Sequence, residues 1–211
     1  MLNSYQSVIC VDSAHIVTHE VGAATAFSGA SALQIKHANG KITPDQIQEV
    51  YDQETYWGSH ATMPKVVSIT QSTEFGTVYS IDEIKAISKL CRRLNLYLHM
   101  DGCRLYNAAV SLNVSLSAIT SDVGVDILSL GGTKNGLMFG EAVLILNPKL
   151  AKDHAQNFSY IHKQGLQLHS KMRYLSAQFI PFFKEGLWKK YAQNANQMAQ
   201  LLSEKFIQNK K

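Results

Sequence analysis

Short apolar runs, separated by segments with helix signals, recur through the first 150 residues of this 211-residue chain. Six runs have the length and content of buried strands, and we expect strands at residues 7–11, 33–35, 66–70, 96–100, 125–130 and 142–146. Continuous apolar strands that alternate with helices are typical of parallel sheets. The sequence therefore predicts an α/β fold, a mostly parallel sheet with helices on both faces.

Two of the intervening helices carry start signals. Thr43 precedes Pro44, so its hydroxyl can cap a helix whose first residue is the proline, and we expect this helix to end near residue 52. Ser80 and Glu83 have the spacing of a capping box, which predicts a helix that ends near residue 95.

The pattern changes near residue 150. Beyond it only helical segments follow, so we expect residues 1–150 to hold the sheet and residues 151–211 to form a separate helical segment.

Composition excludes several classes of function. The net charge is +4 without a basic block, so no nucleic-acid partner is expected. No apolar run approaches the roughly 18 residues of a membrane span, and the first residues lack a signal-peptide pattern. The three cysteines are odd in number and show no metal-type spacing, which favours a reducing compartment such as the cytoplasm and no metal site.

Polar and small residues follow four of the expected strands. In parallel α/β sheets, ligands bind outside the carboxyl ends of the strands. The segments that follow the strands are Asp12 to His15, Gln71 to Glu74, Asp101 to Arg104, and Gly131 to Asn135. We expect these four segments to meet at one edge of the sheet.

Lys134 stands in the segment LSLGGTKNGLMF, directly after an expected strand. A loop lysine is usually solvated. The glycines around this one, however, let the backbone approach a ligand closely. A partly desolvated lysine has a lowered pKa and becomes a nucleophile toward carbonyl groups.

Asp101 and Arg104 each allow two interpretations. Asp101 could cap the following helix, or it could pair with a cationic ligand atom. Arg104 could form a surface ion pair, or it could present its planar fork to a carboxylate or phosphate. With Lys134 as an amine and His15 as a flat partner, Asp101 completes the set of groups that pyridoxal phosphate needs. A carboxylate beside the pyridine nitrogen raises the pKa of that nitrogen and keeps it protonated.

Three segments, HMDGCRLYNAAVSL, DILSLGGTKNGLMFGEAV and AHIVTHEVGA, resemble the low-specificity L-threonine aldolases and related β-eliminating lyases. These are pyridoxal-phosphate enzymes with the aspartate aminotransferase-like fold (fold type I). The resemblance extends from about residue 5 to about residue 202. It implies that the chain forms part of the large, cofactor-binding domain of that fold.

The resemblance also implies roles for individual residues. Lys134 would form an imine with the cofactor, Asp101 would pair with the pyridine nitrogen, and His15 would stack on the ring. Arg104 would hold the substrate carboxylate or help to anchor the cofactor, and Thr133 would contact the cofactor phosphate, with Gly132 beside it. His19 is a less favoured stacking residue than His15.

The activity implied is the cleavage of L-threonine or allo-threonine to glycine and acetaldehyde, by a homodimer or homotetramer. The alternatives are β-elimination or racemisation of another amino acid on the same scaffold, and a remnant without catalytic activity. The family's members extend beyond both ends of this chain, with a phosphate-binding loop before it and a small domain after it. We therefore expect a chain that is truncated at both ends and impaired in activity.

The sequence departs from the family pattern at two places. Cys103 stands where the family carries alanine or serine. The segment 68–78 lacks the histidine that many members carry near the substrate hydroxyl, so the base for the retro-aldol step is unassigned.

Three other features have competing interpretations. His99 shares a strand face with Asp101 and could buttress it or be a satisfied core histidine. The charges of segment 161–179, at Lys163, Lys171 and Arg173, fit a solvated helix better than a cofactor contact. The aromatic residues Phe179, Phe182, Phe183 and Trp188 fit a core or an interface better than a cofactor site.

Overall fold

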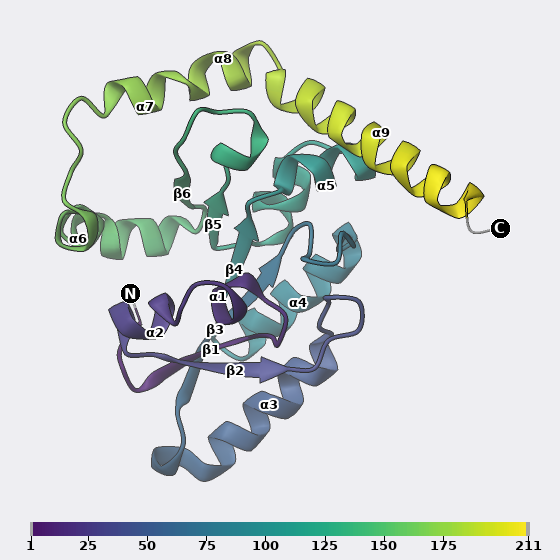
Figure 1. Cartoon of the computed structure of the whole chain (residues 1–211). Helices are drawn as coiled ribbons and strands as arrows, with labels where there is room; N and C mark the ends of the chain where they lie inside the picture. The colour runs from purple at the N-terminus through teal and green to yellow at the C-terminus, as the bar shows by residue number, and fades with distance from the viewer. Residues whose placement is uncertain (1, 210–211) are drawn as a thin grey trace.

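The computed structural model describes residues 2–209, and a six-stranded sheet forms its centre (Figure 1). The strands are β1 Gln6–Val11, β2 Ser31–Ile35, β3 Met63–Thr70, β4 Tyr97–Gly102, β5 Ile127–Leu130 and β6 Ala142–Ile145, in the order β2-β1-β3-β4-β5-β6. Neighbouring strands are parallel except β6, which pairs antiparallel with β5 at the edge. The predicted mostly parallel sheet is confirmed. Because β1 lies between β2 and β3, the strand order reverses there, which is where sheets of this kind bind ligands.

The helices that connect the strands are α1 His15–Thr18, α2 Ala23–Ser28, α3 Pro44–Trp57, α4 Ile81–Arg93 and α5 Leu105–Leu112. Both predicted caps are confirmed as capping boxes: Thr43 accepts from the Gln46 N–H, and Ser80 accepts from the Glu83 N–H. Helix α3 continues past the expected end at residue 52 because no glycine or proline interrupts it before Gly58. Short 3₁₀ turns follow at η1 Gly58–His60, η2 Ser117–Ile119, η3 Ser121–Val123 and η4 Thr133–Asn135.

The two faces of the sheet are covered unequally. One face carries Ile9, Val67, Leu98 and Leu128, which are buried in a single core with the inner residues of α3, α4 and α5. The opposite face carries the alternate residues. Val8 and Cys10 help to line a cavity of about 600 Å³, and Ser68 helps to line two cavities of about 360 and 320 Å³. Helices thus lie on both faces, but α1, α2 and the start of α6 cover the second face only in part.

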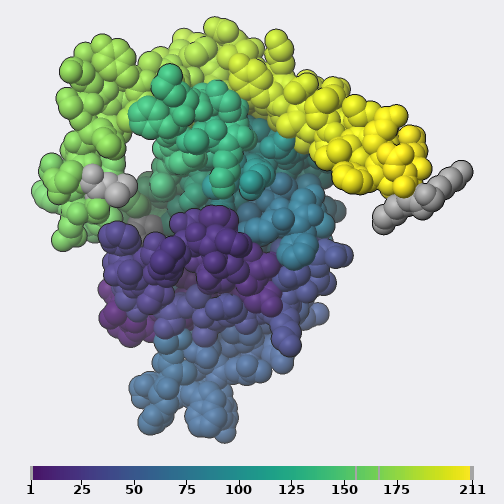
Figure 2. Space-filling view, in the orientation of Figure 1, coloured from purple at the N-terminus to yellow at the C-terminus, as the bar shows by residue number. Residues whose placement is uncertain are grey.

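The last part of the described chain is helical, as expected, with α6 Pro148–Leu166, α7 Arg173–Ala177, α8 Phe179–Lys184 and α9 Leu187–Gln208. Helices α6, α7 and α8 form an arm that leaves the sheet and returns above β6, and Figure 2 shows an opening between this arm and the body. Helix α9 then packs along α5 through paired amide hydrogen bonds of Asn107 and Asn196, both 3.0 Å. None of the helices within residues 2–209 is long and apolar enough to cross a membrane.

The aromatic cluster near α8 is packing, as predicted. Phe182 is buried and meets the ring of Tyr106 edge to face, with the ring centroids 5.1 Å apart. Trp188 lies against the same Tyr106 ring, at 5.9 Å. These contacts attach the arm to α5 and explain the spacing of the aromatic residues.

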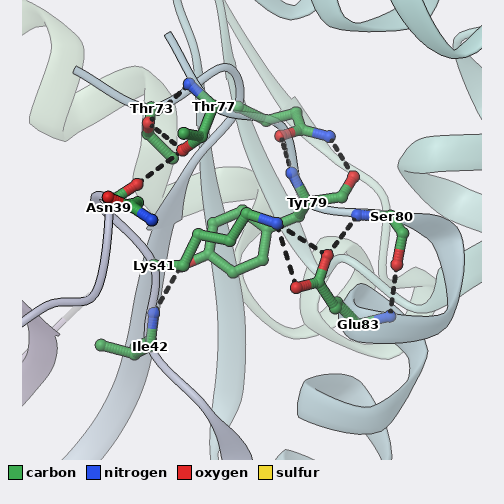
Figure 3. A network of polar contacts seen from close by, with 9 residues as sticks. Asn39, Lys41, Ile42, Thr73, Thr77, Tyr79, Ser80 and Glu83 are labelled. Carbon is green, nitrogen blue, oxygen red and sulfur yellow. Dashed lines mark hydrogen bonds and ion pairs between the residues drawn. The ribbon is translucent and has the colours of Figure 1, made fainter. Parts of the chain in front are cut away.

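A polar network joins the loop before α3 to the loop before α4 (Figure 3). Its contacts pair Tyr79 with Ile42, Lys41 with Glu83, and Thr77 with Asn39. The Gln71 side chain also spans its own loop, because its amide donates to the Tyr79 carbonyl and accepts from the Tyr79 N–H. The segment that follows β3 is therefore fixed from both sides.

Candidate active site

A cavity of about 320 Å³ lies at the carboxyl ends of the parallel strands. Its walls come from α1, from the ends of β3, β4 and β5, and from the residues at the start of β6, and they include Ile16, Thr70, Asp101, Cys103, Ser129 and Glu141. Contacts join the four segments expected to follow strands: the His15 N–H donates to Glu74, the Gln71 N–H to the Asp101 carbonyl, and the Asn135 amide to the Cys103 carbonyl. They meet because parallel strands place their carboxyl ends together.

Asp101 lies inside β4 and lines this cavity. The interpretation of Asp101 as a helix cap is wrong, since α5 begins after Arg104, which makes no side-chain cap bond. Strand β4 continues two residues beyond the expected end at Met100. Asp101 therefore belongs to the carboxyl end of the strand and not to the start of the following helix. One carboxylate oxygen, Oδ1, accepts the Cys103 N–H at 2.9 Å, which fixes the orientation of the carboxylate.

Lys134 lies in the turn η4, between β5 and β6, and its side chain is exposed. The expected partial desolvation of its amine is therefore not seen within the described chain. The turn itself is held firmly. The Asn135 side-chain amide donates to the Cys103 carbonyl at 2.8 Å, which attaches the turn to the end of β4.

The charges of both Asp101 and Lys134 influence the pKa of the Cys103 thiol. Burial, together with a hydrogen bond to Asp101 and the charge of Asp101, raises the pKa of its thiol to about 12, although the charge of Lys134 acts in the opposite direction. Asp101 accepts the Cys103 N–H and Asn135 donates to the Cys103 carbonyl, so Asp101 and the turn that carries Lys134 meet at one residue. The thiol stays protonated at neutral pH and is no nucleophile.

His15 is the first residue of α1, and two carboxylates hold it. Its N–H donates to Glu74 Oε1 at 2.9 Å, and the same oxygen accepts from the Thr70 hydroxyl at 3.1 Å. Its ring Nδ1 lies 2.7 Å from Glu20 Oε1. The ring is 39% exposed, and the ring of His19 lies 5.2 Å away, centroid to centroid.

The other candidate residues lie on the surface. Arg104 is exposed at the start of α5. Thr133 is exposed, its N–H donates to Glu141, and its hydroxyl oxygen accepts from the Gly140 N–H. The cationic residues Lys163, Lys171 and Arg173 are all exposed, which agrees with the interpretation of a solvated segment.

His99 lies on the floor of the cavity, on the same strand face as Asp101, as predicted. Its Nδ1 lies 2.8 Å from the Ser68 hydroxyl and its Nε2 lies 3.0 Å from the Ser129 hydroxyl. Burial lowers the pKa of the imidazole, so the ring is neutral at pH 7. Both ring nitrogens therefore have partners, as in a satisfied core histidine.

The carboxylates around this site were not found from the sequence. Glu141 bonds the backbone at residues 132 and 133, whereas Glu20 and Glu74 hold His15. Glu74 lies 59 residues from His15, so no local pattern signals the contact. The one usable signal was a lone glutamate between Gly140 and an apolar strand, next to the lysine turn.

Comparisons with known proteins agree with this arrangement. The family model for "Beta-eliminating lyase" matches residues 1–210. The low specificity L-threonine aldolase of Pseudomonas sp. (strain NCIMB 10558) is 47% identical over 204 residues, which are 96% of this chain and 57% of that protein. This chain therefore spans a little over half the length of that curated relative.

Solved structures give the same result. The threonine aldolase of Leishmania major superimposes with a TM-score of 0.87 at 33% identity, covering 96% of this chain and 57% of that one. The aspartate aminotransferase of Thermus thermophilus superimposes with a TM-score of 0.65 at 10% identity, over 93% of this chain and 48% of that one. At such low identity the second likeness concerns the fold alone, and it agrees with the predicted aminotransferase-like fold.

Proposed function

The chain belongs to the β-eliminating lyase family, and on that premise we propose that it serves as a pyridoxal-phosphate-dependent carbon–carbon lyase. The reaction is the cleavage of L-threonine or allo-threonine to glycine and acetaldehyde. The relative at 47% identity, itself a low specificity L-threonine aldolase, supports this substrate class. Since the chain spans 57% of that relative, we attribute to it the part of the site that its own residues form.

One observation carries the proposal: Asp101 accepts the Cys103 N–H, and Asn135, next to Lys134, donates to the Cys103 carbonyl, beside a cavity of about 320 Å³ that Asp101 and Cys103 line. An aldehyde cofactor with a pyridine ring needs an amine and a carboxylate at the same site. The residues fit that group. Lys134 would hold the aldehyde carbon, Asp101 the ring nitrogen and His15 the ring face, with Arg104 and Thr133 available to anionic groups of cofactor or substrate.

The residues of the chain would have the following roles in this reaction. When bound, the cofactor supplies an electron sink for the pair left on the α carbon as the Cα–Cβ bond breaks. Asp101 keeps the ring nitrogen protonated, because an adjacent anion raises its pKa. The proton of the β hydroxyl must pass to a base, and His15, tied at Nδ1 to Glu20, offers its Nε2 for that proton.

The test is spectroscopic. Pyridoxal phosphate added to the purified chain should give a visible absorbance band that Lys134→Ala removes and that Lys163→Ala, at another exposed lysine, keeps. A band of equal strength in both variants would mean that the cofactor reacts with surface lysines at random, and the assignment would be withdrawn. Product assays with threonine, serine and cysteine then separate an aldolase, which releases acetaldehyde from threonine, from a β-eliminating enzyme.

We also propose that the protein is a homodimer or homotetramer of the cytoplasm. Exposed apolar side chains support an interface: Met138, Phe139 and Val143 follow the turn that carries Lys134, and Tyr160 and Tyr174 lie on the helical arm. The three cysteines are all free, which suits a reducing compartment. Light scattering of the purified protein measures the assembly directly, and a monomeric mass at micromolar concentration would refute the proposed assembly.

A further inference from the structure

A carboxylate closes the turn that carries Lys134. Glu141 Oε2 accepts the Gly132 N–H at 2.7 Å, and Glu141 Oε1 accepts the Thr133 N–H at 3.2 Å. These N–H groups belong to the two residues directly before the lysine. The Gly140 N–H donates to the Thr133 hydroxyl at 3.0 Å, so residues 132–141 form a closed loop in which Lys134 directly follows the contacts that close it.

The remaining sides of this loop are also attached to the body. Asn135 holds it to the end of β4 through the Cys103 carbonyl. The side chain of Gln178 holds it to the helical arm, because it accepts from the Met138 N–H and donates to the Phe139 carbonyl. Of these anchors, only Glu141 is ionic, and only Glu141 lines the cavity.

Two neighbouring N–H groups that point to one place form a ready site for an anion. Here the side chain of Glu141 already supplies that anion. A hydrogen bond to a charged acceptor contributes more than one between neutral groups, so the carboxylate is a strong competitor for this pair. A phosphate group could use the two N–H donors only by displacing Glu141.

We infer that Glu141 is a positioning residue for Lys134. Its carboxylate holds the turn in the shape that presents the amine beside Asp101, and it keeps the Gly132 and Thr133 N–H groups away from the cofactor phosphate. The inference deepens the proposed function and rests on it. It also limits the expected role of Thr133 to its hydroxyl group.

The experiment labels Lys134 with two probes, pyridoxal phosphate and pyridoxal, which lacks the phosphate. The amine replaces the aldehyde oxygen, which leaves as water, and hydride from borohydride then reduces the carbon–nitrogen double bond. Mass spectrometry of the digested protein gives the labelled fraction at Lys134 and at the other lysines. Glu141→Ala should slow labelling at Lys134 about tenfold with both probes, because two charge-assisted hydrogen bonds are lost.

Glu141→Gln keeps one acceptor oxygen and should give an intermediate rate, which also guards against a misfolded alanine variant. Glu185→Ala removes an exposed glutamate at the end of α8 and should change nothing. Two outcomes contradict the inference. One is an unchanged labelling rate in Glu141→Ala, and the other is a rate that rises with pyridoxal phosphate but not with pyridoxal, since the N–H pair would then be the phosphate site.

Failure of the proposed function looks different. In that case Lys134 of the unchanged protein is labelled no faster than exposed lysines such as Lys163. The hydrogen bonds from the turn to Glu141 can still be tested without any cofactor, by the hydrogen-exchange rates of the two backbone amides. The amides of Gly132 and Thr133 should exchange at least tenfold faster in Glu141→Ala, because each loses its only acceptor among the described contacts. Unchanged protection would overturn the inference on its own.

Discussion

Replacement of Asp126 by alanine should lower the free energy of unfolding by about 3 kcal/mol, although the residue lies outside the cavity. Asp126 is 1% exposed and stands just before β5. Its carboxylate accepts four hydrogen bonds: two from Arg92 at 2.8 and 2.9 Å, one from the Leu98 N–H at 2.7 Å, and one from the Asn147 amide at 2.6 Å. One side chain thus joins α4, β4, β5 and the start of α6.

The magnitude follows from what each partner loses. Arg92 is 45% exposed and regains water, so its share is at most about 1 kcal/mol. The Leu98 N–H is buried and would be left without an acceptor, which costs about 1–3 kcal/mol. Asn147 caps α6 by accepting from the Lys149 and Leu150 N–H groups, and a misplaced cap costs about 1 kcal/mol. These contributions together give the figure of about 3 kcal/mol.

Urea unfolding followed by circular dichroism measures the change, and the slope of the transition should be unaltered. Asp122→Ala is the matched control, because Asp122 is exposed and its side chain is bonded only by the neighbouring Ser121 hydroxyl among the contacts of the described chain. It should change stability by less than about 0.5 kcal/mol. If Asp126→Ala costs no more than Asp122→Ala, the carboxylate does not hold the strands, and the reasoning is refuted.

Two further predictions concern the floor and wall of the cavity. Burial holds the pKa of His99 below its ordinary value of 6.5, so the unfolded chain binds a proton that the folded chain does not; stability is then full above about pH 6.5 and falls as the pH drops toward the folded pKa. His99→Gln should flatten this fall between pH 7.5 and 5.5 by up to about 1.4 kcal/mol per pH unit in urea titrations, and parallel curves for the two proteins would contradict it. For Cys103, whose pKa burial and Asp101 raise to about 12, alkylation by iodoacetamide at pH 8 should be slow and should accelerate in Asp101→Asn. An unchanged rate would show that Asp101 does not act on the thiol.

The sequence predicted the features that depend on neighbouring residues. Apolar runs identified the strands, and the caps at Thr43 and Ser80 were found because each cap bonds a group three residues away. Asp101 was harder. Whether it caps a helix or ends a strand depends on how far β4 pairs with β3 and β5, and its partners there, Thr70 and Ser129, lie 31 and 28 residues away in the sequence. The carboxylates of Glu74 and Glu141 were missed for the same reason, since their contacts exist only after the loops have closed.

The glycines beside Lys134 show that one motif can have more than one physical reason. They were expected to let a ligand approach the backbone. In the structure they let the chain approach itself: a Cβ on Gly131 would lie 2.5 Å from the Cys103 carbonyl oxygen, and one on Gly132 would overlap the Gly140 carbonyl. Asn135 bonds that same Cys103 carbonyl. Composition cannot separate the two reasons, because both require a residue without a side chain.

The close contact at Gly131 has a consequence for the chemistry. Cys103 also donates its N–H to Asp101, so the peptide groups of one residue touch both the lysine turn and the carboxylate. Lys134 and Asp101 are therefore positioned by one shared element, and a change at residue 131 or 103 would move both groups together. This shared contact gives a physical reason for the two motifs to occur as a pair, since the position of the lysine turn relative to the Asp101 carboxylate depends on the packing around one residue.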